Sequence, residues 1–258
     1  MRLMKRILSA AAVLALSASL LVGCSSGTAS SVPVSASSAA ESTVSSVEET
    51  ASSAVDENEA AAAQLLNDLT GSYQELWPVI LADEYKQTWL DDCTALVGED
   101  NAEAAFEKLS SMVTGDVYGE DAVKAYANGG GAYFCGFTNS LATLTFDGET
   151  STISGTDKDG NVLFSHTYHY IGMEPVRGLY EFQSDDADSG EFTYFFLAPD
   201  TSAETYHIEF RYGSDADALS QYDAGDYAYW LASGISTDCD QTMIDNCIEL
   251  FCTENLAG

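Results

Sequence analysis

The residues that could most directly do chemistry lie on a predicted strand at positions 204–212. The even positions from 206 to 212 are apolar, whereas the odd positions carry polar side chains that include His207 and Glu209. Side chains two residues apart on a strand point to the same side, so this imidazole and this carboxylate lie together. Both groups are ligands for divalent metal ions. If this face lines the inside of a small closed sheet, the pair predicts a metal site.

The other motifs do not indicate catalysis. The sequence lacks the G-x-S-x-G, H-E-x-x-H, P-loop and G-x-G-x-x-G patterns that accompany common enzyme chemistries. Its three histidines are His166, His169 and His207, and nothing around them indicates a Ser–His or Cys–His pair. We therefore expect no catalytic residues and no enzyme.

Short predicted strands lead up to the strand at 204–212. From the three glycines at 129–131 onward, β-branched and aromatic runs alternate with turn signals. The runs cover residues 132–138, 141–146, 151–155, 162–170, 178–183, 191–197 and 204–212. So many strands with short connections imply antiparallel hairpins, which predicts a mainly β fold, either a barrel or a sandwich.

Helices are predicted before these strands. Apolar residues at helical spacing cover positions 60–69, 79–96, 102–113 and 121–127. Pro78 suits the first position of the second helix, and Asn101 suits the N-cap of the third. The residues at 72–77 fit either a short strand or the lead-in to a helix.

A single helix is predicted after the strands, over residues 237–255. Thr237 and Asp240 approximate a capping box at its start. Its apolar stripe should pack on the sheet and consists of Met243, Ile244, Cys247, Leu250 and Phe251.

The N-terminal residues indicate export. Residues 1–23 combine a basic start with an apolar run, which is typical of a secretory signal, and Leu21 to Cys24 resembles the lipobox of bacterial lipoproteins. We expect Cys24 to be lipidated and to anchor the protein to the membrane on its extracytoplasmic side. The Ser-rich residues 24–58 predict a flexible tether, and residues 59–258 predict one domain.

The charge of the chain excludes two classes of partner. With 41 acidic and 9 basic residues, the formal net charge is -32. Such a chain repels nucleic acid and anionic lipid, so we expect contact with the membrane through the lipid anchor only. Diffuse acidity attracts cations without forming a metal site.

Five cysteines remain beyond Cys24, so at least one thiol stays free in a monomer. Export permits disulfides, yet the spacing reveals no pairing. Cys247 and Cys252, five residues apart on one predicted helix, are poorly aligned to bridge each other. One or two structural disulfides are favoured, with buried reduced thiols as the alternative in an anaerobic cell.

Several phrases of the sequence resemble one known family. They occur in the family's order at 71–78, 176–182, 198–199, 206–208, 213–215 and 227–230. The family is ZinT, also called YodA, whose members are extracytoplasmic zinc-binding domains with a calycin or lipocalin-like antiparallel barrel. The resemblance covers nearly the whole globular part. It implies a helical N-terminal part, a barrel and one C-terminal helix.

The resemblance also implies a function, with departures at the metal site. Members bind zinc or similar divalent ions for scavenging or for delivery to a metal-uptake transporter. Their site uses three histidines, of which this chain has His207; Thr205 and Phe195 stand where the other two are expected. Glu209, with help from Glu204, His166 or His169, would have to complete a zinc site. The alternative is a calycin domain with a degenerate metal site that binds a small molecule or another envelope protein.

Overall fold

The computed structural model describes residues 57–113, 115–198 and 207–256. Of the two units into which the chain divides, Met1–Val44 lies outside this part, and the description concerns the unit Ser45–Gly258. The predicted signal, Cys24 and the tether lie outside the described residues, except that positions 57 and 58 are already helical.

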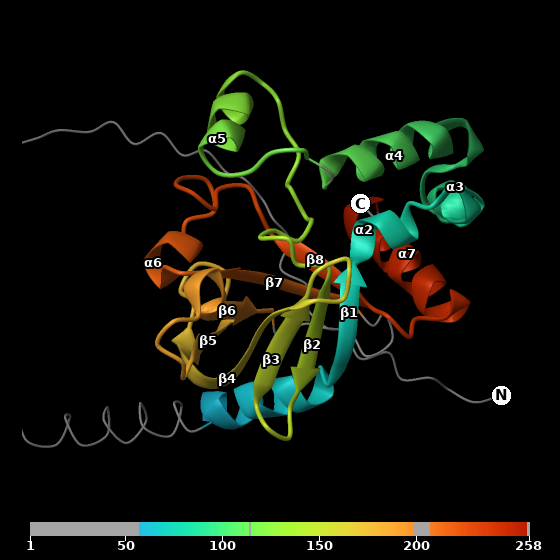
Figure 1. Cartoon of the computed structure of the whole chain (residues 1–258). Helices are drawn as coiled ribbons and strands as arrows, with labels where there is room; N and C mark the ends of the chain where they lie inside the picture. The colour runs from blue at the N-terminus through green and yellow to red at the C-terminus, as the bar shows by residue number, and fades with distance from the viewer. Residues whose placement is uncertain (1–56, 114, 199–206, 257–258) are drawn as a thin grey trace, which may run out of the picture. The chain divides into compact units, whose positions relative to one another are not determined.

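Eight antiparallel strands form a closed barrel in the described chain (Figure 1). Each strand pairs with the next, and β1 pairs with β8 to close the sheet. The strands are β1 Gly71–Glu75, β2 Thr143–Asp147, β3 Thr152–Thr156, β4 Val162–Met173, β5 Tyr180–Ser184, β6 Tyr194–Leu197, β7 His207–Gly213 and β8 Ala232–Ser236. The predicted mainly β fold with flanking helices is therefore confirmed, and the barrel is the form that it takes.

The barrel interior is filled by apolar side chains. All eight strands contribute to one buried cluster, because alternate residues of each strand point inward. Aromatic rings dominate it: the Phe195 ring lies 5.3 Å from Tyr212 and 6.4 Å from Phe210 between centroids. A helix over residues 57–68 supplies Leu65 and Leu66 to the same cluster. In Figure 1 this helix covers the lower end of the barrel.

A layer of helices packs beside the barrel and has its own apolar core. It contains α2 Leu76–Ile80, the 3-10 turn η1 Asp83–Tyr85, α3 Lys86–Val97, α4 Glu99–Met112 and α7 Gln241–Leu256. Trp89, Leu109 and Ile248 are fully buried there, and Ile235 of β8 joins them from the outer face of the barrel. We call this arrangement the helical layer. The remaining short elements are α5 Glu120–Ala127, η2 Gly190–Phe192 and α6 Ala216–Leu219.

Two strand predictions need correction, and one open alternative is decided. Residues 132–138 do not form a barrel strand; a single parallel bridge joins Phe134 to Trp230 just before β8, and both residues pack with the interior cluster of the barrel. For residues 72–77 the strand alternative holds as far as Glu75, the end of β1, and β8 was not predicted. The alternation of β8 is hidden because both of its faces are buried, one in the barrel and one under the helical layer.

Helix starts also differ from the sequence expectations. The predicted helix at 79–96 is interrupted, since α2 ends at Ile80 and α3 begins at Lys86. Pro78 is the third residue of α2 rather than the first, a position in the first turn where its missing N–H is equally harmless. Gly98, with φ of 83°, lets the chain reverse directly into α4, so Asn101 lies inside that helix and is not its N-cap.

The C-terminal helix begins later and packs elsewhere than expected. The Asp240 carboxylate alone accepts the cap hydrogen bond, from Met243 N at 3.0 Å, whereas Thr237 N donates to Ser72 O of β1. α7 packs chiefly on α3, with Ile248 and Cys252 at the centre of the contact. The predicted stripe is therefore rotated toward the helical layer instead of the sheet.

Candidate functional site

His207 and Glu209 lie on the outer face of the barrel. Phe210 and Tyr212, on the other face of β7, belong to the interior cluster. His207 stands opposite Ile235, which belongs to the core of the helical layer, and Glu209 stands opposite Ser233. The idea that this polar face lines the barrel interior is wrong. The aromatic face buries more apolar surface, and this burial decides which way the strand faces.

The other two histidines are held by aspartates near the end of β5. His166 Nδ1 lies 2.6 Å from Asp186 Oδ2, and its ring stacks on Phe164. His169 Nδ1 lies 2.7 Å from Asp185 Oδ1 at an exposed position. The expected alternation is confirmed, because the two rings occupy opposite faces of β4.

The donor set for a metal ion is small in the part of the chain that the structure describes. No group of three or more His, Cys, Asp and Glu side chains is close enough there to hold a metal. His207 and Glu209 share a face and supply two donors. Two donors do not fit the four-coordinate zinc site that the family resemblance implies.

Cys135 lies beside Glu209 on the same side of the barrel. Its carbonyl accepts from Ser233 N at 3.0 Å, which holds residues 134–136 along β8. Burial raises the pKa of the Cys135 thiol to about 12, and the negative charge of Glu209 adds to this rise. Cys135 is therefore protonated at neutral pH and does not offer a thiolate nucleophile.

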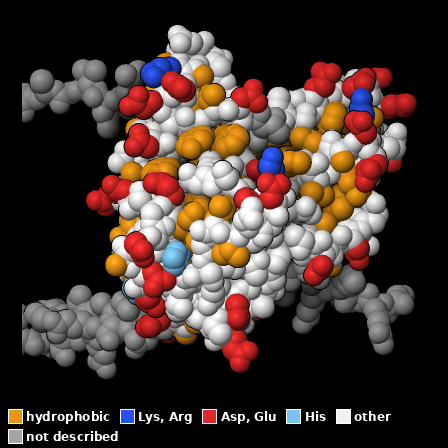
Figure 2. Space-filling model, in the orientation of Figure 1, with side chains coloured by type: hydrophobic (Ala, Val, Ile, Leu, Met, Phe, Trp, Pro, Cys, Tyr) orange, Lys and Arg blue, Asp and Glu red, His pale blue; other side chains and the backbone are white. Residues whose placement is uncertain are grey.

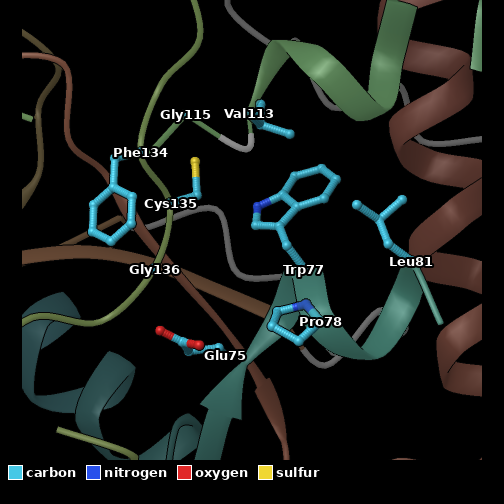
Figure 3. A pocket seen from close by; sticks show the side chains of 9 residues that line it. All are labelled: Glu75, Trp77, Pro78, Leu81, Val113, Gly115, Phe134, Cys135 and Gly136. Carbon is cyan, nitrogen blue, oxygen red and sulfur yellow. The ribbon is translucent and has the colours of Figure 1, made fainter. Parts of the chain in front are cut away.

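A pocket opens between α2 and the segment that carries Cys135 (Figure 3). We call it the α2 pocket; its volume is about 360 Å³. Three stretches far apart in the sequence line it, and they contribute Glu75, Trp77, Pro78, Leu81, Val113, Gly115, Phe134, Cys135 and Gly136. Apart from Glu75 and Cys135, the lining is aromatic, aliphatic or backbone.

Glu75 is the charged group of the α2 pocket. It is the last residue of β1, and its Oε1 accepts from Phe137 N at 2.6 Å. Gly136 makes this approach possible, because a Cβ there would lie 3.0 Å from Glu75 Oε1 and 2.8 Å from the Phe134 ring. The carboxylate is thus held at the pocket wall by a backbone bond and a close backbone contact.

Trp77 supplies the unpaired donor of the pocket. The indole N–H of Trp89 donates to Ile80 O at 2.7 Å, and that of Trp230 donates to Gly136 O at 2.9 Å. Trp77 Nε1 is buried and makes no hydrogen bond of ordinary geometry within the described residues; its polar neighbour is the Cys135 thiol, whose pKa it lowers. In Figure 3 it points toward the Cys135 sulfur, which is a weak acceptor. A buried donor without a good partner costs about 1–3 kcal/mol, so a ligand acceptor placed there would gain free energy.

A cationic stack lies farther along the outer face. The guanidinium carbons of Arg177 and Arg211 each lie 4.4 Å from the centre of the Tyr222 ring. Arg211 is fully buried and donates to the carbonyl oxygens of Leu219 and Tyr227. The stack therefore holds residues 219–227 against β7.

The α2 pocket could not be predicted from the sequence. Trp77 and Phe134 look like ordinary core aromatics, and no local motif links them to Cys135. Only the unusual run Cys135-Gly136 after three glycines signals a close backbone approach. Acidic side chains are spread over the face seen in Figure 2, with few Lys and Arg between them. Such a surface attracts cationic ligands.

Comparisons with known proteins found similar structures but no matching sequence. No protein-family model matches the sequence, and no significant match is found among curated proteins. The structure is similar to the Zn(II)-bound ZinT-like domain of Streptococcus pneumoniae AdcA, with 14% identity and a TM-score of 0.45 over 71% of this chain and 89% of that domain. It is also similar to Zn(II)-bound AdcA itself, with 12% identity and a TM-score of 0.42. That match covers 72% of this chain and 35% of AdcA.

Proposed function

We propose that this chain is a lipid-anchored, extracytoplasmic binding protein, not an enzyme, and that it takes a small molecule in the α2 pocket. One observation carries the proposal: the pocket combines aromatic walls, a carboxylate and a buried indole N–H whose polar neighbour is the weakly accepting Cys135 sulfur. Ligand sites of this kind are mostly apolar with a few polar groups that fix orientation. The packed barrel interior supports a site on the outer face.

The lining defines the ligand class. Trp77 and Phe134 favour a flat apolar body. Glu75 favours a positively charged or hydrogen-bond-donating group, and the acidic surface of the chain concentrates cations near it. An apolar ring that carries an amine fits this combination, and benzylamine is the simplest probe.

The indole N–H resonances test the location of binding. The chain has three tryptophans, so an ¹H–¹⁵N spectrum shows three indole peaks, which Trp→Phe variants assign. Benzylamine should shift the Trp77 peak and leave the Trp89 peak in place, since the Trp89 N–H is bonded to Ile80 O and buried in the helical layer. Unchanged peaks, or equal shifts of all three, would contradict the α2 pocket as the site.

The charge of Glu75 tests the ligand class. Glu75→Gln keeps an oxygen that accepts from Phe137 N and removes the negative charge. A half-exposed ion pair of about 1 kcal/mol predicts roughly fivefold weaker binding of benzylamine and unchanged binding of benzyl alcohol. Glu149→Gln, an exposed change of equal charge in the turn after β2, is the matched control. Equal loss in both variants would refute a local role for Glu75.

A second candidate function is the binding of a divalent metal ion, zinc in the first instance, for scavenging or delivery to an uptake transporter. The observation in its favour is that His207 and Glu209 project from the same face of β7. Two protein donors predict weak binding, with water or further groups completing the coordination.

Calorimetry distinguishes the metal hypothesis from the small-molecule hypothesis. After treatment with a chelator, the protein is titrated with zinc beside His207→Ala and the matched control His169→Ala, whose imidazole is exposed on β4. Micromolar binding that only His207→Ala abolishes would support the metal function. Binding that survives in both variants would move the metal away from His207.

The membrane anchor is proposed on the sequence of residues 1–24. No helix in the described part of the chain is both long enough and apolar enough to cross a membrane. Labelling of cells with a fatty acid should mark the protein, and Cys24→Ser should abolish the label and release the protein from the membrane fraction. A labelled Cys24→Ser variant would refute lipidation at this residue.

A further inference from the structure

Two cysteines meet in the centre of the helical layer. Cys93 of α3 and Cys252 of α7 lie with their sulfur atoms 3.9 Å apart, and both side chains are fully buried. They are 159 positions apart in the sequence, so no spacing rule connects them. Their contact comes from the packing of α7 on α3.

The other thiols do not offer the same contact. Cys135 belongs to the same apolar core as Cys93 and Cys252, but it lines the α2 pocket beside Glu209 and is not on α3 or α7. Cys239 precedes α7 and lies near enough to Cys247 to raise the pKa of its thiol. Their sulfur atoms, however, do not make a contact like the one between Cys93 and Cys252 within the described residues. Cys247 and Cys252 are on one helix and do not face each other.

We propose that Cys93 and Cys252 form a disulfide that staples α7 to α3 in the exported protein. The proposal rests on the export proposed above, because an oxidising compartment is required. The oxidant is a disulfide compound, either a small molecule or a thiol oxidoreductase. One protein thiolate attacks it, forms a mixed disulfide and releases the first thiol; the second thiolate attacks that mixed disulfide and releases the second. The protein loses two electrons and two protons, and the oxidant takes up both.

The bond should close while the helical layer is still open. Burial raises the pKa of both thiols, and the charge of Asp92 adds to this rise. Few thiolates therefore exist in the folded protein, and an oxidant cannot reach them there. Once formed, the disulfide is protected from reductants for the same reason.

The charges of the two helices explain why a covalent link is useful. Burial raises the pKa of Asp92 on α3, and the carboxylates of Glu249 and Asp245 on α7 raise it further. Like charges across the contact weaken it, and one bond from Thr88 Oγ1 to Asp245 at 3.5 Å is long. A disulfide between α3 and α7 offsets this repulsion between their carboxylates.

Refolding of the full chain tests the proposal without any need for export. The unfolded, reduced protein is refolded with oxidised and reduced glutathione, the free thiols are alkylated, and the linked peptides are identified by mass spectrometry. We expect a peptide pair joining Cys93 to Cys252 and a melting temperature about 10 °C above that of the reduced protein, given the length of the closed loop. Oxidation of protein already folded should be roughly tenfold slower or more.

Two variants make the assignment specific. Cys93→Ala should abolish the linked pair and the rise in melting temperature, whereas Cys135→Ala should keep both. Reduced and oxidised wild-type protein are compared directly, so the result does not depend on the folding of a variant. Free thiols throughout, a dominant pair that excludes Cys93, or a linked form less stable than the reduced one would overturn the proposal. Lipid labelling of Cys24 tests export separately.

Discussion

The buried arginine on β7 allows a sharp prediction, Arg211→Lys. Burial lowers the pKa of the Arg211 guanidinium, and the carbonyl oxygens of Leu219 and Tyr227 accept its hydrogen bonds. Gln221 O lies 3.4 Å from Nη2 and offers a weaker contact. A planar guanidinium reaches several carbonyls at once because its donors form a rigid fork. A lysine ammonium keeps the charge and loses this fork.

The magnitude follows from what a lysine leaves unpaired. A lysine reaches at most one of the two strong acceptors, so one bond to a charged donor is lost, which is worth about 1.5–3 kcal/mol. The other carbonyl oxygen, of Leu219 or Tyr227, is then buried without a hydrogen-bond donor. We therefore expect the free energy of unfolding to fall by about 3 kcal/mol and the melting temperature to fall by roughly 10 °C.

Urea denaturation measures this loss, and Arg177→Lys is the matched control. Arg177 stacks on the same Tyr222 ring at the same 4.4 Å and also lies 5.7 Å from the Tyr133 ring, so its variant changes the cation–π contacts at least as much as Arg211→Lys does. The side-chain bond of Arg177, to Tyr133 Oη, is long at 3.4 Å, which predicts a loss below about 1 kcal/mol. Equal losses in the two variants would show that the stack, and not the carbonyl bonds, gives Arg211 its role.

Two further predictions concern the cores. Tyr212→Phe should lower the free energy of unfolding by about 1–3 kcal/mol in urea, because Tyr212 Oη accepts from Thr138 N at 2.6 Å and donates to Thr138 O at 2.9 Å, both buried. A change below about 0.5 kcal/mol would refute this. The second prediction concerns Asp92, whose pKa is raised above 3.8 in the folded state. The folded protein therefore binds a proton at Asp92 more readily than the unfolded protein does, and the free energy of unfolding falls as the pH rises through the raised pKa. Asp92→Asn should remove this contribution to the pH dependence of the free energy of unfolding. Because solvent screens the charge of Asp92, the variant should be more stable by less than about 1 kcal/mol at pH 7. An unchanged pH dependence would contradict the prediction.

The strands of the barrel could largely be predicted from the sequence. Period-2 alternation depends on local chemistry, and it located β2 to β7 to within a few residues. The same rule failed at residues 132–138, an apolar run that packs on the interior cluster through Phe134 and Phe137 without forming a barrel strand. It also missed β8, whose two faces are both buried. Alternation of apolar and polar residues identifies a strand only when one face of that strand is exposed to solvent.

The amino-acid sequence by itself determined that this chain forms a small antiparallel sheet with helices before and after it, since these features follow from short-range periodicity. It also paired His207 with Glu209, because residues two apart on a strand share a face. Only the tertiary structure decided that this face lies outside the barrel, that Trp77 meets Cys135 across the α2 pocket, and that Cys93 meets Cys252. These contacts join distant segments. They depend on which apolar surfaces bury each other best, a property of the whole fold that no local pattern contains.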